Sequence, residues 1–322
     1  KYGKQIGKNT YKYPSQFSYN YAIAKKEKGS KYGVVNINGE FVSRPKFYQA
    51  NTFNEFGVAI VKKNSFYGLI DTTGKMLTNY SFVKIDSFSS EWAYATNENG
   101  LVMLHISGKI IDLNDEFYEY EPFYDGVSRL KFNGYYGFID TSGKTVFPFE
   151  LNRATNFQNG FTFCKKQGEL PFCINATGNV VFEFSGWIQN GFKEGLAIIK
   201  QKGQSIYIDT TGSAVFEQGF KKALPFSQDV GRVKTGKRWA VINRNGQILN
   251  TAKYKKIRSF NLVYSVVKRN GSYGLYDNDG KIVLDVMYDE LYLYDDYYFF
   301  LSVNDRVGHF HILDGWVWQP ER

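Results

Sequence analysis

The sequence predicts an all-β fold, a tandem array of about nine similar repeats of 34–35 residues each. Three observations predict it. Residues 66–75 (FYGLIDTTGK) and residues 135–144 (YYGFIDTSGK) share seven of ten residues although they lie far apart in the chain. A turn glycine returns every 34 to 36 residues. Aromatic residues make up 18% of the chain and only 7 residues are proline, which favours pleated strands over helices.

Three columns of residues keep the same phase along the chain. The turn glycines are Gly3, Gly39, Gly74, Gly108, Gly143, Gly178, Gly212, Gly246, Gly280 and Gly315. An aromatic column follows them at Phe17, Phe53, Phe88, Phe123, Phe157, Phe192, Phe226 and Phe260. A column of small residues comes next at Ala22, Ala59, Ala93, Ser128, Thr162, Ala197, Gly231 and Ser265. We therefore predict one array over residues 1–322 rather than two independent domains.

Each repeat is expected to contain three short strands, named here A, B and C. In residues 57–77, strand A covers residues 57–61, strand B covers residues 67–71, and strand C follows Gly74. Apolar residues alternate or form short β-branched blocks, without the spacing of three to four typical of a helical array. About ten irregular residues should then lead to the next aromatic column.

The turn between strands B and C has a local chemical explanation. In Asp71-Thr72-Thr73-Gly74 the Asp side chain can accept hydrogen bonds from the turn backbone, and the glycine supplies the positive φ. The same chemistry recurs from Asn36, Asp140, Asp209, Asn243 and Asp277, and His105 occupies this column in the third repeat. We interpret these polar residues as turn formers rather than as catalytic acids or calcium ligands.

Stacking such repeats predicts an open β-solenoid or superhelix in which each repeat buries its apolar face against its neighbours. The alternative is a closed β-propeller. A propeller blade commonly has four strands in about 40–45 residues, more than these repeats provide.

An aromatic-Gly dipeptide, an Ile-Asp-x-x-Gly-Lys turn and a downstream Phe-x-x-Gly-x-Ala recur in phase. They stand as Tyr67-Gly68, Ile70-Asp71, Gly74-Lys75 and Phe192, Gly195 and Ala197. Together they are similar to the WG repeat family, also called KWG repeats. The resemblance covers essentially the whole chain and implies an antiparallel β repeat, found in bacterial and often exported proteins, without catalytic activity.

The sequence departs from that family because Tyr usually replaces Trp, and Trp239-Ala240 is the nearest approach to the namesake pair. Four repeats lack the dipeptide and are expected to be less regular: Leu101-Val102, Pro171-Phe172, Ser205-Ile206 and Gly308-His309 stand in its place. We interpret the aromatic rings of the dipeptides as packing residues, because a glycine without Cβ lets a ring lie against the backbone. Stacking on a carbohydrate is the other interpretation.

No pattern points to an enzyme or a cofactor. The chain has no P-loop, no Gly-x-Gly-x-x-Gly after a strand and no Gly-x-Ser-x-Gly elbow, and its three histidines lack a partner at an interpretable spacing. His309 and His311 share a strand face as a metal pair would, but no third ligand is identifiable. We expect no metal and no small-molecule substrate.

Two cysteines, Cys164 and Cys173, lie on strands A and B of one hairpin. Either a cross-strand disulfide or two buried free thiols is compatible with this spacing.

The net charge of +9 favours an acidic partner. Basic residues recur in the connection between strands A and B of successive repeats. They are Lys25, Lys26, Lys62, Lys63, Lys165, Lys166, Lys200, Lys202, Lys234, Lys237, Lys268 and Arg269, with Lys131 in the same place. Equivalent loops of a stacked array lie along one edge, so these residues predict a basic edge. Lysines that only protect strand edges against aggregation are the alternative.

Two segments interrupt this pattern. The third repeat has Asn97-Glu98-Asn99 in the connection. An acidic segment nearby, comprising Asp112, Asp115, Glu116, Glu119, Glu121 and Asp125, lacks the alternation of a calcium loop and is interpreted as solvated.

The function predicted from these observations is a non-catalytic interaction or scaffold module that binds another protein or an acidic polymer. A carbohydrate-binding module that uses exposed aromatics is the alternative, and nucleic acid is not expected because no known module accompanies the basic residues. The chain has no transmembrane run and begins with Lys1 rather than Met, so we expect an exported protein whose signal peptide or anchor was removed. A cytoplasmic protein with a trimmed chain is also compatible.

Overall fold

A computed structural model of the chain describes residues 10–113, 117–227, 229–249, 256–260, 264–277, 281–294 and 297–319. These residues form 31 β-strands and no helix, which confirms the all-β prediction. Accordingly, nothing in the described ranges could cross a membrane as a helix. The chain divides into two compact halves, Lys1–Phe157 with Ala176–Gly178 and Gln158–Asn175 with Asn179–Arg322.

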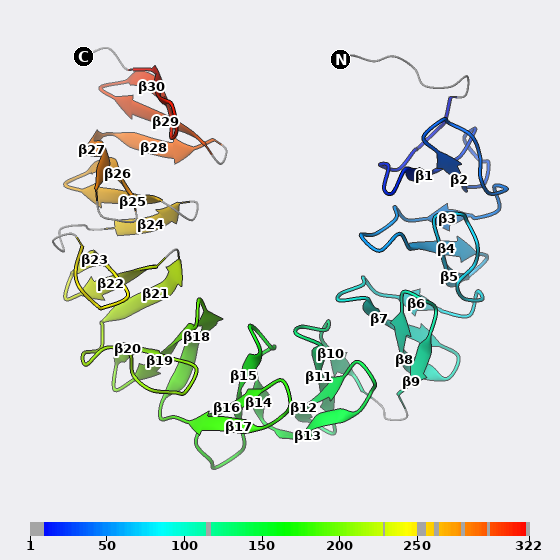
Figure 1. Cartoon of the computed structure of the whole chain (residues 1–322), viewed down its shortest axis with the longest axis horizontal. Helices are drawn as coiled ribbons and strands as arrows, with labels where there is room; N and C mark the ends of the chain where they lie inside the picture. The colour runs from blue at the N-terminus through cyan, green and yellow to red at the C-terminus, as the bar shows by residue number, and fades with distance from the viewer. Residues whose placement is uncertain are drawn as a thin grey trace. The chain divides into compact units, whose positions relative to one another are not determined.

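The N-terminal half holds the blue to green strands of Figure 1. Their bounds are β1 (Tyr21–Ala24), β2 (Gly33–Asn36), β3 (Gln49–Ala50), β4 (Ala59–Lys63), β5 (Phe66–Ile70), β6 (Lys84–Ile85), β7 (Trp92–Asn97), β8 (Gly100–His105), β9 (Ile110–Asp112), β10 (Glu119–Tyr120), β11 (Val127–Phe132), β12 (Tyr135–Asp140), β13 (Thr145–Leu151) and β14 (Arg153–Ala154). They form the sheets β1–β2, β3–β5, β6–β9 and β10–β13, in which neighbours in sequence pair antiparallel.

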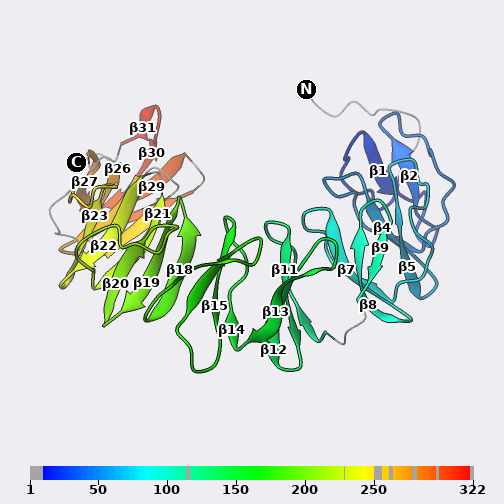
Figure 2. The same ribbon diagram turned by 60° about the horizontal axis from the view of Figure 1, so that its bottom comes forward.

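The C-terminal half continues the same arrangement. Its strands are β15 (Phe161–Lys165), β16 (Phe172–Asn175), β17 (Val180–Glu183), β18 (Trp187–Lys193), β19 (Leu196–Gln201), β20 (Gln204–Ile208), β21 (Lys222–Ser227), β22 (Val230–Thr235), β23 (Arg238–Ile242), β24 (Lys256–Phe260), β25 (Tyr264–Arg269), β26 (Ser272–Asp277), β27 (Ile282–Tyr288), β28 (Glu290–Leu293), β29 (Tyr298–Val303), β30 (Arg306–His311) and β31 (Gly315–Trp318). The turned view in Figure 2 shows the sheet β18–β20 beside β21–β23, in agreement with the contact between β19 and β21.

The A–B hairpin predicted from the sequence is present in each of the nine sheets of the described residues, whereas strand C forms only in the five four-stranded sheets. In the second repeat, for example, the segment after the turn makes only isolated bridges such as Ile70 with Met76. Strand A is β4 and strand B is β5 in the second repeat, with Ala59 opposite Ile70 and Lys63 opposite Phe66. The third and ninth repeats lack the aromatic-Gly dipeptide but are not less regular, contrary to expectation, because β6–β9 and β28–β31 are complete four-stranded sheets. The sixth repeat, which also lacks it, has three strands and a shifted register between β18 and β19.

The prediction of three strands in every repeat is not confirmed. Among the described residues the strands form nine small sheets, and five of these have four strands. The additional strand comes from the segment predicted to be irregular. Lys84 and Ile85, for example, pair with Thr96 and Ala95 on the outer side of strand A. Strand A would otherwise expose a row of unpaired backbone groups, which the preceding segment covers.

The B–C turn forms as its chemistry predicts. Asp71 Oδ1 accepts hydrogen bonds from the backbone N–H of Thr73 at 2.9 Å and of Lys75 at 3.0 Å. Gly74 has φ +80° and donates to the Asp71 carbonyl at 3.0 Å. In the sixth repeat the 2.6 Å hydrogen bond from Thr211 Oγ1 holds the pKa of Asp209 below its usual range. Gly3 and residues 278–280 lie outside the described residues.

The turn glycines are also packing positions between repeats. A Cβ on Gly108 would lie 2.3 Å from the carbonyl oxygen of Leu77, in the preceding repeat, and a Cβ on Gly178 would lie 2.2 Å from that of Val146. A Cβ on Gly212 would meet the ring of Phe182 at 2.4 Å. Each of these three glycines therefore adopts a positive φ and lets the turn approach the preceding repeat closely.

The core consists of clusters that join neighbouring sheets. One contains Val58 and Leu69 of the second repeat with Ala95 and Val102 of the third. The predicted column of small residues lies in this interior, since Ala22, Ala59, Ala93, Ser128, Thr162, Ala197 and Ser265 are each at most 2% exposed. In the aromatic column Phe53, Phe123, Phe157, Phe192 and Phe226 are buried, whereas Phe17 is 55% exposed. The side chain of Phe260 lies outside the described residues.

Cys164 and Cys173 are both buried, and neither forms a disulfide. Cys173 lies opposite Phe163, and Cys164 opposite Phe172, so the two thiols are on opposite faces of the hairpin. A bond between them would need both Cβ vectors to turn toward each other. Burial raises the pKa of the Cys173 thiol to about 12.

Candidate functional site

The residues of the predicted basic edge lie at the ends of strand A or in the turn that follows it. Lys62 and Lys63 end β4, Lys165 ends β15, and Lys268 and Arg269 end β25. Lys200 and Lys234 lie within β19 and β22. Lys25, Lys26, Lys166, Lys202 and Lys237 lie just beyond strand A. In a repeat that has two of these basic residues, the structure thus places both at the same end of the A–B hairpin.

The two basic residues of a pair differ in environment. The first is half-buried at Lys25, Lys62, Lys165, Lys200, Lys234 and Lys268. The second is exposed at Lys26, Lys63, Lys202, Lys237 and Arg269, and half-buried at Lys166. The first position is therefore partly structural, and the second presents its charge to solvent.

The half-buried lysine lies over the tyrosine of the aromatic-Gly dipeptide. Lys62 is directly opposite Tyr67 in the A–B register. Its Nζ lies 4.7 Å from the ring centroid and donates a 3.2 Å hydrogen bond to the Tyr67 hydroxyl. An ammonium over the face of an aromatic ring is attracted by the ring quadrupole.

The contact recurs wherever the dipeptide has tyrosine. Lys25 lies 4.8 Å from the Tyr32 ring, Lys131 lies 4.9 Å from the Tyr136 ring, and Lys268 lies 4.1 Å from the Tyr273 ring. Where serine replaces the tyrosine, Lys200 instead lies 3.4 Å from the Ser205 hydroxyl and 3.0 Å from the Lys221 carbonyl oxygen. Sequence reasoning missed this contact, although the spacing of five residues between Lys62 and Tyr67, Lys131 and Tyr136, and Lys268 and Tyr273 was a usable signal.

The glycine of the dipeptide makes room for the segment after the B–C turn rather than for the tyrosine. A Cβ on Gly137 would lie 2.6 Å from the ring of Phe149, and a Cβ on Gly68 would lie 3.0 Å from the carbonyl oxygen of Asn79. The packing interpretation of the dipeptide thus applies to its glycine, while its tyrosine holds the lysine in place.

The acidic segment of the fourth repeat is paired with basic residues. Glu119 Oε1 lies 2.8 Å from Lys131 Nζ, and Glu121 Oε1 lies 3.2 Å from Arg129. The hydrogen bond from Lys131 lowers the pKa of Glu119, and the same bond raises the pKa of Lys131. These carboxylates neutralise the basic position of their own repeat. Asp115 and Glu116 lie outside the described residues.

Among the described residues, no group of three or more candidate metal ligands gathers at the histidines or elsewhere. His105 takes the turn position, and its Nδ1 lies 3.2 Å from the Ser107 backbone nitrogen. His309 and His311 share one face of β30, and His311 Nδ1 lies 2.6 Å from Asp314 Oδ2.

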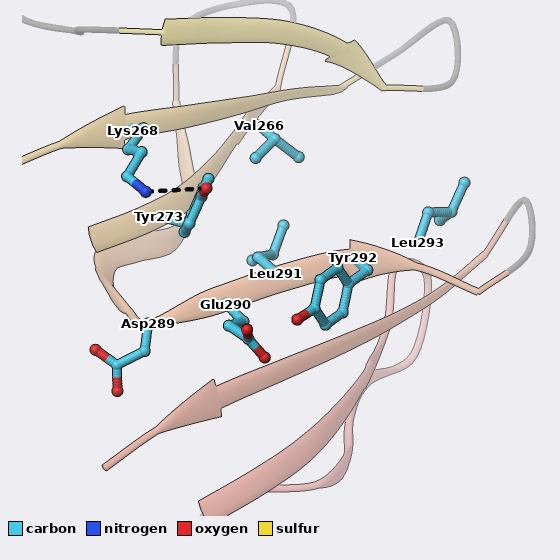
Figure 3. A pocket seen from close by; sticks show the side chains of 8 residues that line it. All are labelled: Val266, Lys268, Tyr273, Asp289, Glu290, Leu291, Tyr292 and Leu293. Carbon is cyan, nitrogen blue, oxygen red and sulfur yellow. Dashed lines mark hydrogen bonds between the residues drawn. The ribbon is translucent and has the colours of Figure 1, made fainter. Parts of the chain in front are cut away.

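A cleft of about 450 Å³ opens in the C-terminal half, between the sheet β24–β27 and the first strand of the next sheet, β28. Figure 3 shows Lys268 and Tyr273 on one side of it and the residues of β28 along the other. The lining residues are Val266, Lys268, Tyr273, Asp289, Glu290, Leu291, Tyr292 and Leu293.

Several large aromatic side chains are exposed outside the A–B hairpins. Those at least half exposed are Tyr13, Phe17, Tyr19, Tyr48, Tyr118, Trp187, Tyr292, Tyr294 and Tyr297.

A family model described as WG containing repeat matches residues 32–65, 67–100, 136–169, 207–239 and 273–304, slightly more than half of the chain. The search among curated proteins gives no match.

Similar solved structures include a eukaryotic initiation factor, with TM-score 0.40 and 13% identity over 91% of this chain and 93% of that one. BamB from Moraxella catarrhalis gives TM-score 0.30 and 12% identity over 82% and 92% of the two chains. Hsv2 of Kluyveromyces lactis gives TM-score 0.34 and 10% identity over 73% and 96%.

Proposed function

This chain belongs to the WG containing repeat family, and from that premise we propose that it is a non-catalytic interaction module that binds an acidic partner through its A–B hairpins. The partner is another protein or an acidic polymer, and the protein acts after export, in the periplasm, at the cell surface or in the medium. Repeat proteins gain binding area by repeating one surface element, and their partner is chosen by residues that vary between repeats.

The observation that carries this proposal is the lysine held over a tyrosine beside an exposed basic residue. Lys62 is fixed against Tyr67 by a ring contact and a hydrogen bond, and Lys63 next to it is exposed. A positioned cation loses less side-chain entropy on binding than a freely rotating lysine does. A lysine held over a tyrosine and an exposed basic residue next to it also occur at Lys25 and Lys26 and at Lys268 and Arg269. This repetition supports recognition of a partner with regularly spaced negative charge.

The test compares two variants of equal charge. One replaces Lys26, Lys63, Lys202 and Lys237 by Gln. The control replaces Lys75, Lys109, Lys144 and Lys221, which are also exposed but lie outside the A–B turns. Each variant lowers the net charge from +9 to +5, because four cations are removed. On immobilised polyglutamate and polyphosphate, we expect the first variant to elute at markedly lower salt than the control.

Equal elution of the two variants would contradict the proposal, since net charge alone would then explain retention. Replacing exposed lysines shifts stability little, so folding should be preserved in both. Fractionation of the native cells with an antibody to the chain tests the proposed export.

The second candidate function is carbohydrate binding by exposed aromatics. It is favoured by the exposure of rings such as Trp187 and Tyr292, at 60% and 53%. The variant with four lysines of the A–B turns replaced should still bind a glycan array if this candidate is correct. A variant with Trp187 and Tyr292 replaced by Ala should not.

The open array predicted from the sequence remains part of this proposal. The small number of strands expected in each repeat argued against a propeller. That reason is weakened, because five sheets have the four strands typical of a propeller blade. A disc-like scattering profile in solution would favour the propeller instead.

A further inference from the structure

The cleft beside β28 offers both donors and acceptors of hydrogen bonds. An ammonium group has three N–H donors, and the described contacts of Lys268 Nζ are both with Tyr273, at 3.0 Å to its hydroxyl and 4.1 Å to its ring. Asp289 and Glu290 provide carboxylate acceptors at the other side. Asp289 Oδ2 already accepts the Asn304 backbone N–H at 2.8 Å, which fixes the position of that carboxylate.

Lys268 and the equivalent lysine of the fourth repeat, Lys131, face different residues on the leading strand of their sheets. The leading strand β10 places Glu119 opposite Lys131, and the two form an ion pair at 2.8 Å. The leading strand β24 instead places Lys256 opposite Lys268. A carboxylate therefore neutralises Lys131 within its own sheet. Lys268 lines the cleft.

The rest of the lining is apolar or aromatic. Val266 and Leu291 are buried, at 6% and 8% exposure, and Leu293 is half-buried. Tyr292 is 53% exposed beside Glu290, with which it shares a hydrogen bond that raises the pKa of the phenol. Figure 3 shows Glu290 and Tyr292 along the same stretch of β28.

This combination indicates the chemistry of the ligand. A volume of about 450 Å³ is within the range of small-molecule sites, roughly 300–1,000 Å³. Two carboxylates and one ammonium give the lining a net charge of −1, which disfavours an acidic ligand. Hydroxyl groups both donate and accept hydrogen bonds, and the C–H face of a sugar ring can lie on tyrosine and leucine. We propose that this cleft binds a neutral sugar residue of a glycan, held by Lys268, Glu290 and Tyr292.

The inference goes beyond the basic edge, with which the cleft shares only Lys268, and names a site for the carbohydrate candidate. The test titrates the whole chain with maltotriose, cellotriose and N-acetylated chitotriose by calorimetry, in about 1 M salt, where the Debye length is about 3 Å. Binding to an acidic polymer is suppressed under this condition, so failure of one proposal is distinguishable from failure of the other.

We expect at least one of these three probes to bind. Glu290→Gln and Tyr292→Ala should each weaken that binding by about tenfold or more, because each removes a group that contacts the sugar. Tyr294→Ala is the matched control, since Tyr294 is 73% exposed and lies outside the lining. Both cleft residues are exposed, and circular dichroism checks that the variants fold.

Two results would overturn the proposal. One is the absence of binding by all three probes. The other is binding that Glu290→Gln and Tyr292→Ala leave unchanged, or that Tyr294→Ala weakens equally.

Discussion

The contact between Lys62 and Tyr67 shows how a residue that is only five positions away becomes a direct neighbour. The two residues lie opposite each other on β4 and β5, and the ammonium lies over the ring at 4.7 Å. Both side chains are half-buried, so the contact is less screened than one in open solvent. It joins the two strands of the hairpin and also fixes the cation that the proposed partner meets.

A double-mutant cycle with Lys62→Met and Tyr67→Leu should give a coupling free energy of about 0.5–1 kcal/mol. Tyr67→Phe should lose only the part due to the 3.2 Å hydrogen bond to the hydroxyl. Urea denaturation of the four proteins measures the coupling. Lys75→Met, at an exposed turn position, is the control and should show no coupling with Tyr67→Leu. Additive effects of the first pair would mean that Lys62 and Tyr67 are merely adjacent.

At the scale of the element, local chemistry was readable from the sequence and cross-strand partners were not. The turn at Asp71 involves residues within four positions, so its hydrogen bonds follow from residue type alone. The strand β6 has only two residues and no alternating pattern, so the pairing of Lys84 with Thr96 left no sequence signal. The cleft was also unpredictable, because it forms where β28 meets the sheet β24–β27.

Packing between two sheets explains an unusual residue on β22. Arg232 is 1% exposed, and burial lowers its pKa. Its Nε lies 3.0 Å from the Ser265 hydroxyl on β25, in the next repeat, and its second terminal nitrogen has no hydrogen-bond partner among the described residues. The equivalent positions Ile198 and Val266 are apolar and buried. At this position of the repeat, the interfaces between neighbouring sheets therefore hold either a buried cation or an apolar side chain.

Arg232→Met should leave the free energy of unfolding unchanged or raise it by about 1–2 kcal/mol, because an incompletely paired buried charge is removed. Ser265→Ala should lower it by about 1–3 kcal/mol, since the Arg232 Nε–H would then lose its partner. Chemical denaturation of both variants checks the signs. Strong destabilisation by Arg232→Met would indicate that the guanidinium has a further partner essential to the fold.

At the scale of the whole molecule, stability should be transmitted from one repeat to the next. Hydrophobic clusters join neighbouring sheets, as Val58 and Leu69 join Ala95 and Leu104. Gly108 reinforces this interface, because its turn lies against the backbone of Leu77 in the preceding repeat. In such a chain stability is approximately a sum over repeats and their interfaces, so damage at one interface should remain local.

Gly108→Ala tests this transmission. Alanine at a positive φ costs roughly 1–2 kcal/mol, and at Gly108 its Cβ would in addition lie 2.3 Å from the Leu77 oxygen. Gly134→Ala is the control, with φ +89° against +88° at Gly108 but no atom within 4 Å of the added Cβ. Hydrogen exchange should show lost protection in β3–β5 and β6–β9 for Gly108→Ala, with β28–β31 still protected. The effect of Gly134→Ala should be smaller. Equal effects of the two substitutions would show that the contact with Leu77 does not couple the repeats, and loss of protection throughout the chain would show that it unfolds as one cooperative unit.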